Sequence, residues 1–153
     1  MLMPYLKKSG KDQNRNEVVF VVKKMIEEKH HMELVDGLSK QLEPILKKSD
    51  QPVCIYLDDN HKNCNEKFAS MLGYPSAKVW NETNGDFLET FIDEEDQEPV
   101  SANYQKMVER LVGSVVEAKW KKKDGGRVNA NVIHVPITFE GHLFALMFVV
   151  SQS

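Results

Sequence analysis

The chain has 153 residues, of which 41% are hydrophobic and 28% are charged, and its formal net charge is −3 at pH 7. These values are typical of a soluble globular protein that buries one core. No apolar run approaches the ~20 residues that span a bilayer, and a net acidic chain is poor evidence for nucleic-acid binding. We therefore expect neither a membrane nor a nucleic-acid partner.

The first residues do not form a signal peptide pattern, because the apolar stretch at 1–6 is short and is soon followed by lysines. The two cysteines have no metal-ligand spacing and fit a reducing compartment. We expect a cytoplasmic protein.

The first fifty residues differ from the rest. Residues 1–16 are polar and contain Pro4 and Gly10, which predicts a flexible N-terminus. Residues 17–49 form a predicted helical extension with two amphipathic segments offset by a phase slip. Their apolar stripes are Val18, Val22, Met25 and Met32, then Val35, Leu38, Leu42 and Ile45.

Two details of this extension stay open at the level of sequence. The run at 18–22 is rich in β-branched residues, so a strand is the alternative to a helix there. Pro44 either kinks the helix or begins a new short helix in its first turn.

The remaining segment, residues 50–153, has the pattern of an α+β domain. We expect strands at 53–57 and from the turn at 58–60 to about Cys64, then a short helix at 65–74. Short helices and loops at 75–100 precede a helix at 101–112, whose apolar face is Tyr104, Met107, Val108 and Leu111. Strands at 114–122, 127–138 and 142–150 complete a five-stranded antiparallel sheet.

The short helix at 65–74 is the most informative stretch. Asn65 can cap its first turn, Phe68 and Leu72 share one apolar face, and Gly73 can end it in the left-handed conformation. With Tyr74, these residues match an N-x-x-F-x-x-x-x-G-Y pattern, and the hairpin Asp124-Gly125 and Pro136 follow. This arrangement resembles a PAS domain. The resemblance covers roughly residues 50–150 and implies a PAS-like five-stranded antiparallel sheet with helices on one face, preceded by the N-terminal helical extension.

The run at 142–150 is apolar at every position after His142, so both faces of this strand should be covered. One face would meet the helices of the domain. The other needs the N-terminal helix, a partner subunit or both, and we therefore expect a homodimer held by the N-terminal segment and the outer face of the sheet.

The resemblance implies a small molecule or cofactor between the sheet and the helices. The stretch Asn84-Gly85-Asp86-Phe87-Leu88 lacks the cysteine of covalent flavin sensors, and the helix at 101–112 lacks the axial histidine of haem sensors. A cysteine for a chromophore of the yellow-protein kind is also missing beyond the first helix. The cofactor stays unknown, and a flavin held without a covalent bond or a haem ligated from elsewhere remains an alternative.

We expect the following residues to line the ligand site: Tyr56, Phe68, Met71, Trp80, Phe91, Tyr104, Met107, Trp120 and His134. His134 shares its alternate set with Val128, Ala130 and Val132, so it should face the interior, where it could bond a ligand, titrate near physiological pH, or simply be a satisfied core histidine. Cys54 and Cys64 would stand opposite each other across a hairpin centred on Asp59. They are either a redox switch or ordinary buried thiols.

No catalytic residues and no metal ligands emerge from the motifs, so we do not expect an enzyme. The leading hypothesis is a signal-sensing PAS module that binds a small molecule, a signalling protein or both, with output through the N-terminal helix and the dimer interface. The alternatives are a ligand-free dimerisation adaptor and a redox sensor with non-covalent flavin.

Overall fold

The computed structural model describes the backbone of residues 10–151 and the side chains of residues 14–150. These residues fall into two units, one up to Glu33 and one from Leu34 onward, which are described separately below. Among the described residues, no helix is both long enough and apolar enough to span a membrane.

The first unit is built on helix α1, which spans Gly10–Gln41 and continues into the second unit. The segment 18–22 is helical, which answers the question left open by its β-branched residues. The helix begins at Gly10 rather than at Glu17, and residues 1–9 of the expected flexible N-terminus lie outside the described residues. Within residues 14–33 the large apolar side chains of α1 are exposed: Val18, Val19, Phe20, Val21, Val22, Met25, Ile26 and Met32.

The second unit begins at Leu34 rather than at residue 50, because the end of α1 packs on the sheet. Helix α1 runs through the expected phase slip without a break and ends at Gln41. Helix α2, Glu43–Lys48, then starts with Pro44 in its first turn, where a missing N–H costs nothing. The extension is therefore one long helix and one short helix, divided near Leu42.

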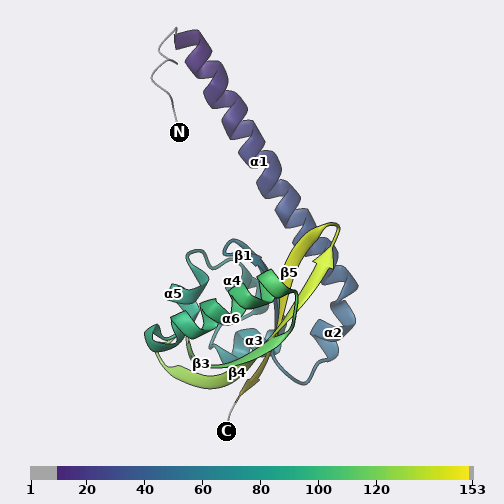
Figure 1. Ribbon diagram of the computed structural model, residues 1–153, viewed down its shortest axis with the longest axis vertical. Coiled ribbons are helices and arrows are strands. Elements are labelled where there is room, and N and C mark those ends of the chain that lie inside the picture. The colour runs from purple at the N-terminus through teal and green to yellow at the C-terminus, as the bar shows by residue number, and fades with distance from the viewer. Residues whose placement is uncertain (1–9, 152–153) are drawn as a thin grey trace. The chain divides into compact units, whose positions relative to one another are not determined.

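The predicted sheet is confirmed. Its strands are β1 Val53–Asp58, β2 His61–Cys64, β3 Ser114–Lys121, β4 Arg127–Phe139 and β5 His142–Ser151. They are all antiparallel in the order β2-β1-β5-β4-β3 (Figure 1). Strands β4 and β5 meet at Glu140 and Gly141, which both have positive φ, 50° and 79°, as a tight hairpin requires.

Five helical elements follow β2 and cover one face of the sheet (Figure 1). They are α3 Glu66–Met71, α4 Ala77–Asn81, α5 Phe87–Phe91, the 3₁₀ turn η2 Glu94–Asp96 and α6 Gln97–Arg110. In α3, Asn65 accepts a hydrogen bond from the Phe68 N–H and Gly73 follows with φ 79°, as predicted. The core on this face includes Phe68, Trp80, Phe91, Met107, Trp120 and Met147.

Helix α6 differs from its prediction at both ends. It begins at Gln97 rather than Ser101, since Pro99 is tolerated in a first turn, where N–H groups lack intrahelical partners. Leu111 does not join the buried face: it adopts the left-handed conformation with φ 54° and is 61% exposed. The chain turns away at this residue, so its side chain leaves the helical phase of Met107.

Part of the opposite face of the sheet is covered by the chain itself. Leu34, Val35, Leu38 and Leu46 pack against Val53, Ile55, Phe144 and Leu146. From Phe144 to Val149 both faces of β5 are thus covered, as its apolar run predicted, with the N-terminal helical segment on the outer side. Val150, at the end of the run, is 42% exposed. Ile45 was expected in this stripe but is 42% exposed; Leu46 takes its place because α2 restarts the helical phase at Glu43.

Candidate functional site

A cavity of about 150 Å³ lies between the sheet and helices α5 and α6 of the second unit. Its walls come from β1, the turn after β1, the start of α5, the first half of α6, β4 and β5. The lining residues are Tyr56, Asp59, Asp86, Phe87, Leu88, Val100, Ser101, Tyr104, His134 and Met147. A volume of this size admits a molecule about as large as benzene.

The ring of Tyr56 stands at a steep angle to two other aromatic rings of this cavity. The centroid of the Tyr56 ring lies 5.1 Å from that of Phe87 and 5.9 Å from that of Tyr104, with interplanar angles of 69° and 86°. The Tyr104 ring also lies 6.2 Å from the His134 ring. These edge-to-face contacts hold the rings in fixed orientations.

Asp59 connects two of these walls. Its Oδ1 accepts a hydrogen bond of 2.7 Å from the Tyr56 hydroxyl and one of 3.1 Å from the Phe87 N–H. Burial, with the hydrogen bond to Asp59, raises the pKa of Tyr56, so this phenol stays protonated. One carboxylate therefore positions both a ring of β1 and the start of α5.

Asp86 caps α5, and its Oδ1 accepts a hydrogen bond of 2.9 Å from the Glu89 N–H. The capped turn sets Phe87 and Leu88 against the cavity. Asp86 thus adds a negative charge to the cavity wall, and its cap helps to fix the start of α5.

His134 is only 1% exposed, so its interior position is confirmed. The Nδ2 of Asn103, on α6, lies 2.8 Å from its Nδ1. Burial lowers the pKa of His134 to about 4, so the ring is neutral at pH 7. Of the three roles that the sequence left open, this environment disfavours titration near physiological pH. With Nδ1 accepting from the Asn103 amide, the ring proton is on Nε2.

The structure brings three of the nine expected site residues to this cavity: Tyr56, Tyr104 and His134. Phe68, Trp80, Phe91, Met107 and Trp120 are buried in the adjacent core, and Met71 packs partly buried against it. Phe68, for example, packs its ring 4.8 Å from Trp80 and 5.6 Å from Trp120. These six residues fill the space between sheet and helices and do not line the cavity.

The lining residues that sequence reasoning missed are Asp59, Asp86, Phe87, Leu88, Val100, Ser101 and Met147. The position of Asp86 could have been predicted from the sequence, because an Asp directly before a short apolar run is typical of a helix N-cap. For Asp59 the sequence indicated only a turn. Its contact with Phe87 joins residues 28 positions apart, which no local pattern predicts.

Lys62 is an unusual residue next to this site, because its side chain is buried. Its Nζ donates to the carbonyl oxygens of Thr83 at 2.6 Å and Asp59 at 3.0 Å, and it lies 5.2 Å from the centroid of the Trp80 ring. Burial lowers the pKa of Lys62. Two carbonyl oxygens and an aromatic face satisfy a lysine that the sequence pattern would place on the surface.

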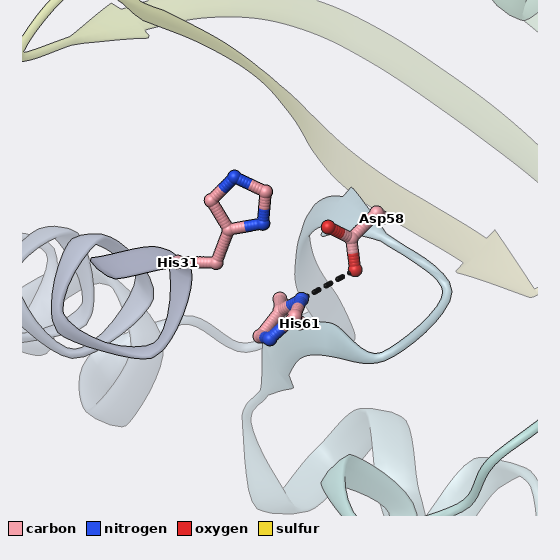
Figure 2. Close-up of side chains that lie close together, drawn as sticks. All are labelled: His31, Asp58 and His61. Atoms are coloured by element: carbon pink, nitrogen blue, oxygen red, sulfur yellow. Dashed lines mark hydrogen bonds and ion pairs between the residues drawn. The ribbon is translucent and has the colours of Figure 1, made fainter. Parts of the chain in front are cut away.

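The turn between β1 and β2 holds a contact between an aspartate and a histidine. His61 Nδ1 lies 2.6 Å from Asp58 Oδ1 (Figure 2), and the same oxygen accepts a hydrogen bond from the Asn60 N–H. The strand register shifts between Tyr56 and Asp58. These contacts fix the turn that presents the neighbouring Asp59 to the cavity.

Cys54 and Cys64 face each other across β1 and β2, as the predicted register required. Both are buried free thiols, and burial raises the pKa of each. A buried thiol with a raised pKa is a poor nucleophile. This environment favours ordinary core cysteines over a redox switch.

No protein-family model matches this sequence, and neither does any curated protein. Among solved structures, it is similar to a PAS domain of a protein from Colwellia psychrerythraea, with a TM-score of 0.60 and 18% identity over 75% of this chain and 97% of that chain.

A PAS domain from a two-component sensor histidine kinase gives a TM-score of 0.58 and 11% identity, over 76% of this chain and 98% of that chain. A light-oxygen-voltage domain studied with a flavin analogue gives a TM-score of 0.55 and 17% identity, over 76% of this chain and 85% of that chain. The strand order, the helices inserted after β2 and these similarities agree: the chain has the PAS fold.

Proposed function

We propose that this chain is a signal-sensing PAS module whose cavity binds a small molecule. The observation that carries the proposal is the cavity of about 150 Å³, in which buried His134 and the rings of Tyr56 and Tyr104 meet. Convergent polar groups in a largely apolar concave site are the usual mark of a binding site. The similar histidine kinase and light-oxygen-voltage proteins support a sensory role by analogy of fold.

The sheet offers a route from ligand to output. His134 and Met147 are register partners in β4 and β5, and both line the cavity. Their neighbours Val135 and Leu146 are partners too, and they face the outer cluster with Leu34 and Leu38 of α1. A ligand that prefers one arrangement of β4 and β5 would therefore shift the surface on which the end of α1 packs.

Two alternatives remain. A flavin redox sensor is disfavoured by size, because cofactor-sized sites usually have about 300 Å³ or more and this cavity has about 150 Å³. A ligand-free adaptor would keep the cavity empty and act through protein contacts alone.

An absorption spectrum and native mass spectrometry of the purified full chain, followed by thermal-shift measurements with a panel of molecules of benzene size, separate these functions. We expect no flavin or haem band and a saturable shift with some members of the panel. Ser101→Phe should abolish the shift by filling the cavity, whereas Lys106→Phe, an exposed position elsewhere on α6, should keep it. A flavin band would support the redox sensor, and the absence of any saturable shift would support the adaptor.

We propose further that the module acts as a homodimer through α1, and that the dimer presents a surface to a signalling protein. Val18, Val22, Met25 and Met32 repeat at the spacing of a two-helix seam and are 47–62% exposed. Lys29 lies in the same stripe. A second copy in antiparallel orientation avoids placing two Lys29 side chains together, which favours that arrangement.

A further inference from the structure

The charges around the cavity point to the class of its ligand. We propose that the cavity binds a small organic cation, such as a methylated ammonium group. This inference rests on the proposed ligand-binding function and adds the charge of the ligand.

The carboxylates supply the first part of the argument. Among the residues that line the cavity, Asp59 and Asp86 carry charge at pH 7, and none is a lysine or an arginine. Within residues 14–150, their hydrogen bonds come from neutral donors, the Tyr56 hydroxyl and the N–H groups of Phe87 and Glu89, and neither carboxylate is in an ion pair. The charge of Asp86 is therefore available to attract a cation, whereas that of Asp59 is partly balanced by its electrostatic interaction with Lys62.

The nearby positive groups do not reverse this charge. Burial keeps the imidazole of His134 neutral. The Nζ of Lys62 is occupied by the carbonyl oxygens of Thr83 and Asp59 and by the Trp80 ring, and Lys62 does not line the cavity. An anionic ligand would meet two carboxylates and no cationic partner.

The aromatic walls supply the second part. The Tyr56 ring lies within 6 Å of both the Phe87 and the Tyr104 ring and stands at a steep angle to each, so the three rings form adjoining aromatic walls. A cation within about 6 Å of an aromatic face is attracted by the negative face of the ring, and aromatic cages bind quaternary ammonium groups. Two carboxylates beside three rings suit a cation with an apolar surface better than a neutral ligand.

Three probes of similar shape and different charge test this inference by titration calorimetry on the full chain: tetramethylammonium, tert-butyl alcohol and pivalate. We expect saturable binding of tetramethylammonium, with a Kd at least about tenfold lower than that of tert-butyl alcohol, and no binding of pivalate. Asp86→Asn should weaken tetramethylammonium binding several-fold, since Asn still caps α5. Glu89→Gln removes an exposed charge on α5 that does not line the cavity, and it should leave binding unchanged.

The outcomes separate this inference from the proposed function. Equal or tighter binding of tert-butyl alcohol or pivalate would overturn the cationic ligand and still support a ligand site. Tetramethylammonium binding that Asp86→Asn and Glu89→Gln weaken equally would also overturn it, because the attraction would then come from the general acidity of the surface. If none of the three probes binds, the cation inference fails, and the wider thermal-shift panel decides on the proposed function.

Discussion

His134 is a buried neutral histidine, and it should make folding depend on pH. Its pKa is about 4 in the folded chain and about 6.5 in an unfolded chain. Between these values the unfolded chain binds a proton that the folded chain does not, so the free energy of unfolding decreases as pH falls from about 6.5 towards 4 and levels off below. The total loss from this group is about 3 kcal/mol.

Urea unfolding of the wild type and of His134→Gln at pH 7 and pH 4.5 measures this contribution. Gln carries no proton in either state, so the free energy of unfolding of the variant should change between the two pH values by about 2–3 kcal/mol less than that of the wild type. The comparison uses the difference between pH values, because the substitution also alters packing near Asn103 and Tyr104. Equal pH dependence of both proteins would show that His134 does not titrate as described.

Asn65 holds the start of β1 and the start of α3 together. Its Oδ1 accepts hydrogen bonds from the N–H groups of Phe68 at 2.9 Å and Val53 at 3.1 Å, and its Nδ2 donates to the Gln51 carbonyl. Asn65→Ala removes the helix cap and leaves the buried Val53 N–H without a partner, so it should lower the free energy of unfolding by about 2–4 kcal/mol. Ser76→Ala, which removes only an exposed cap of α4, should cost about 0.5–1 kcal/mol. Similar urea midpoints for the two variants would contradict this double role.

At the scale of residues, the sequence predicted what depends on local spacing. The Asn65 cap and the facing of Cys54 and Cys64 follow from positions a few residues apart. The cavity wall depends on how α5 and α6 approach the sheet, and no local pattern encodes this. Aromatic size is also a poor guide, because Trp80 and Trp120 fill the core while the smaller Ser101 lines the cavity.

At the scale of elements, the cover on the outer face of the sheet depends on Leu38, which is 2% exposed, and not on Ile45. Leu38→Ala should lower the free energy of unfolding by about 2–4 kcal/mol, because it leaves a cavity between α1 and the sheet. Ile45→Ala should cost less than about 1 kcal/mol, since an exposed side chain buries little surface. Urea unfolding of the two variants gives the comparison, and an equal cost would mean that the helix is in the phase predicted from the sequence.

The elements themselves were predictable to different degrees. The strands agree with their predicted bounds within about one residue, because alternation and turns at Asp124-Gly125 and Glu140-Gly141 mark their ends. Helix α1 was harder to predict, because its apolar pattern changes phase near Met32 and Val35 while the helix continues. The change of phase marks the passage from the exposed stripe to the part that packs on the sheet, which only the tertiary contacts of Leu34 and Leu38 reveal.

At the scale of the whole molecule, residues 34–48 cover the outer face of the sheet at β1, β5 and the end of β4, so that part no longer argues for a partner. Val115 of β3 and Val150 of β5 stay 61% and 42% exposed. The feature that still argues for a partner is the exposed stripe of α1 in the first unit, formed by Val18, Val22, Met25 and Met32. Deleting residues 1–46 would uncover the sheet as well as remove the stripe, so it would confuse misfolding with loss of a dimer. Single substitutions within residues 14–33 of the full chain avoid this problem.

We predict that the full chain sediments as a dimer at micromolar concentration and that Val22→Glu makes it a monomer. Val22 lies in the stripe with Val18, Met25 and Met32, and burying a charge in that seam would cost several kcal/mol. Phe20→Glu is the matched control: it places the same charge on the same exposed helix but on the opposite side from Val22, so the dimer should persist. Circular dichroism should show that both variants fold. A monomeric wild type, or equal dissociation by both substitutions, would contradict a dimer through this stripe and, with it, signal output through α1.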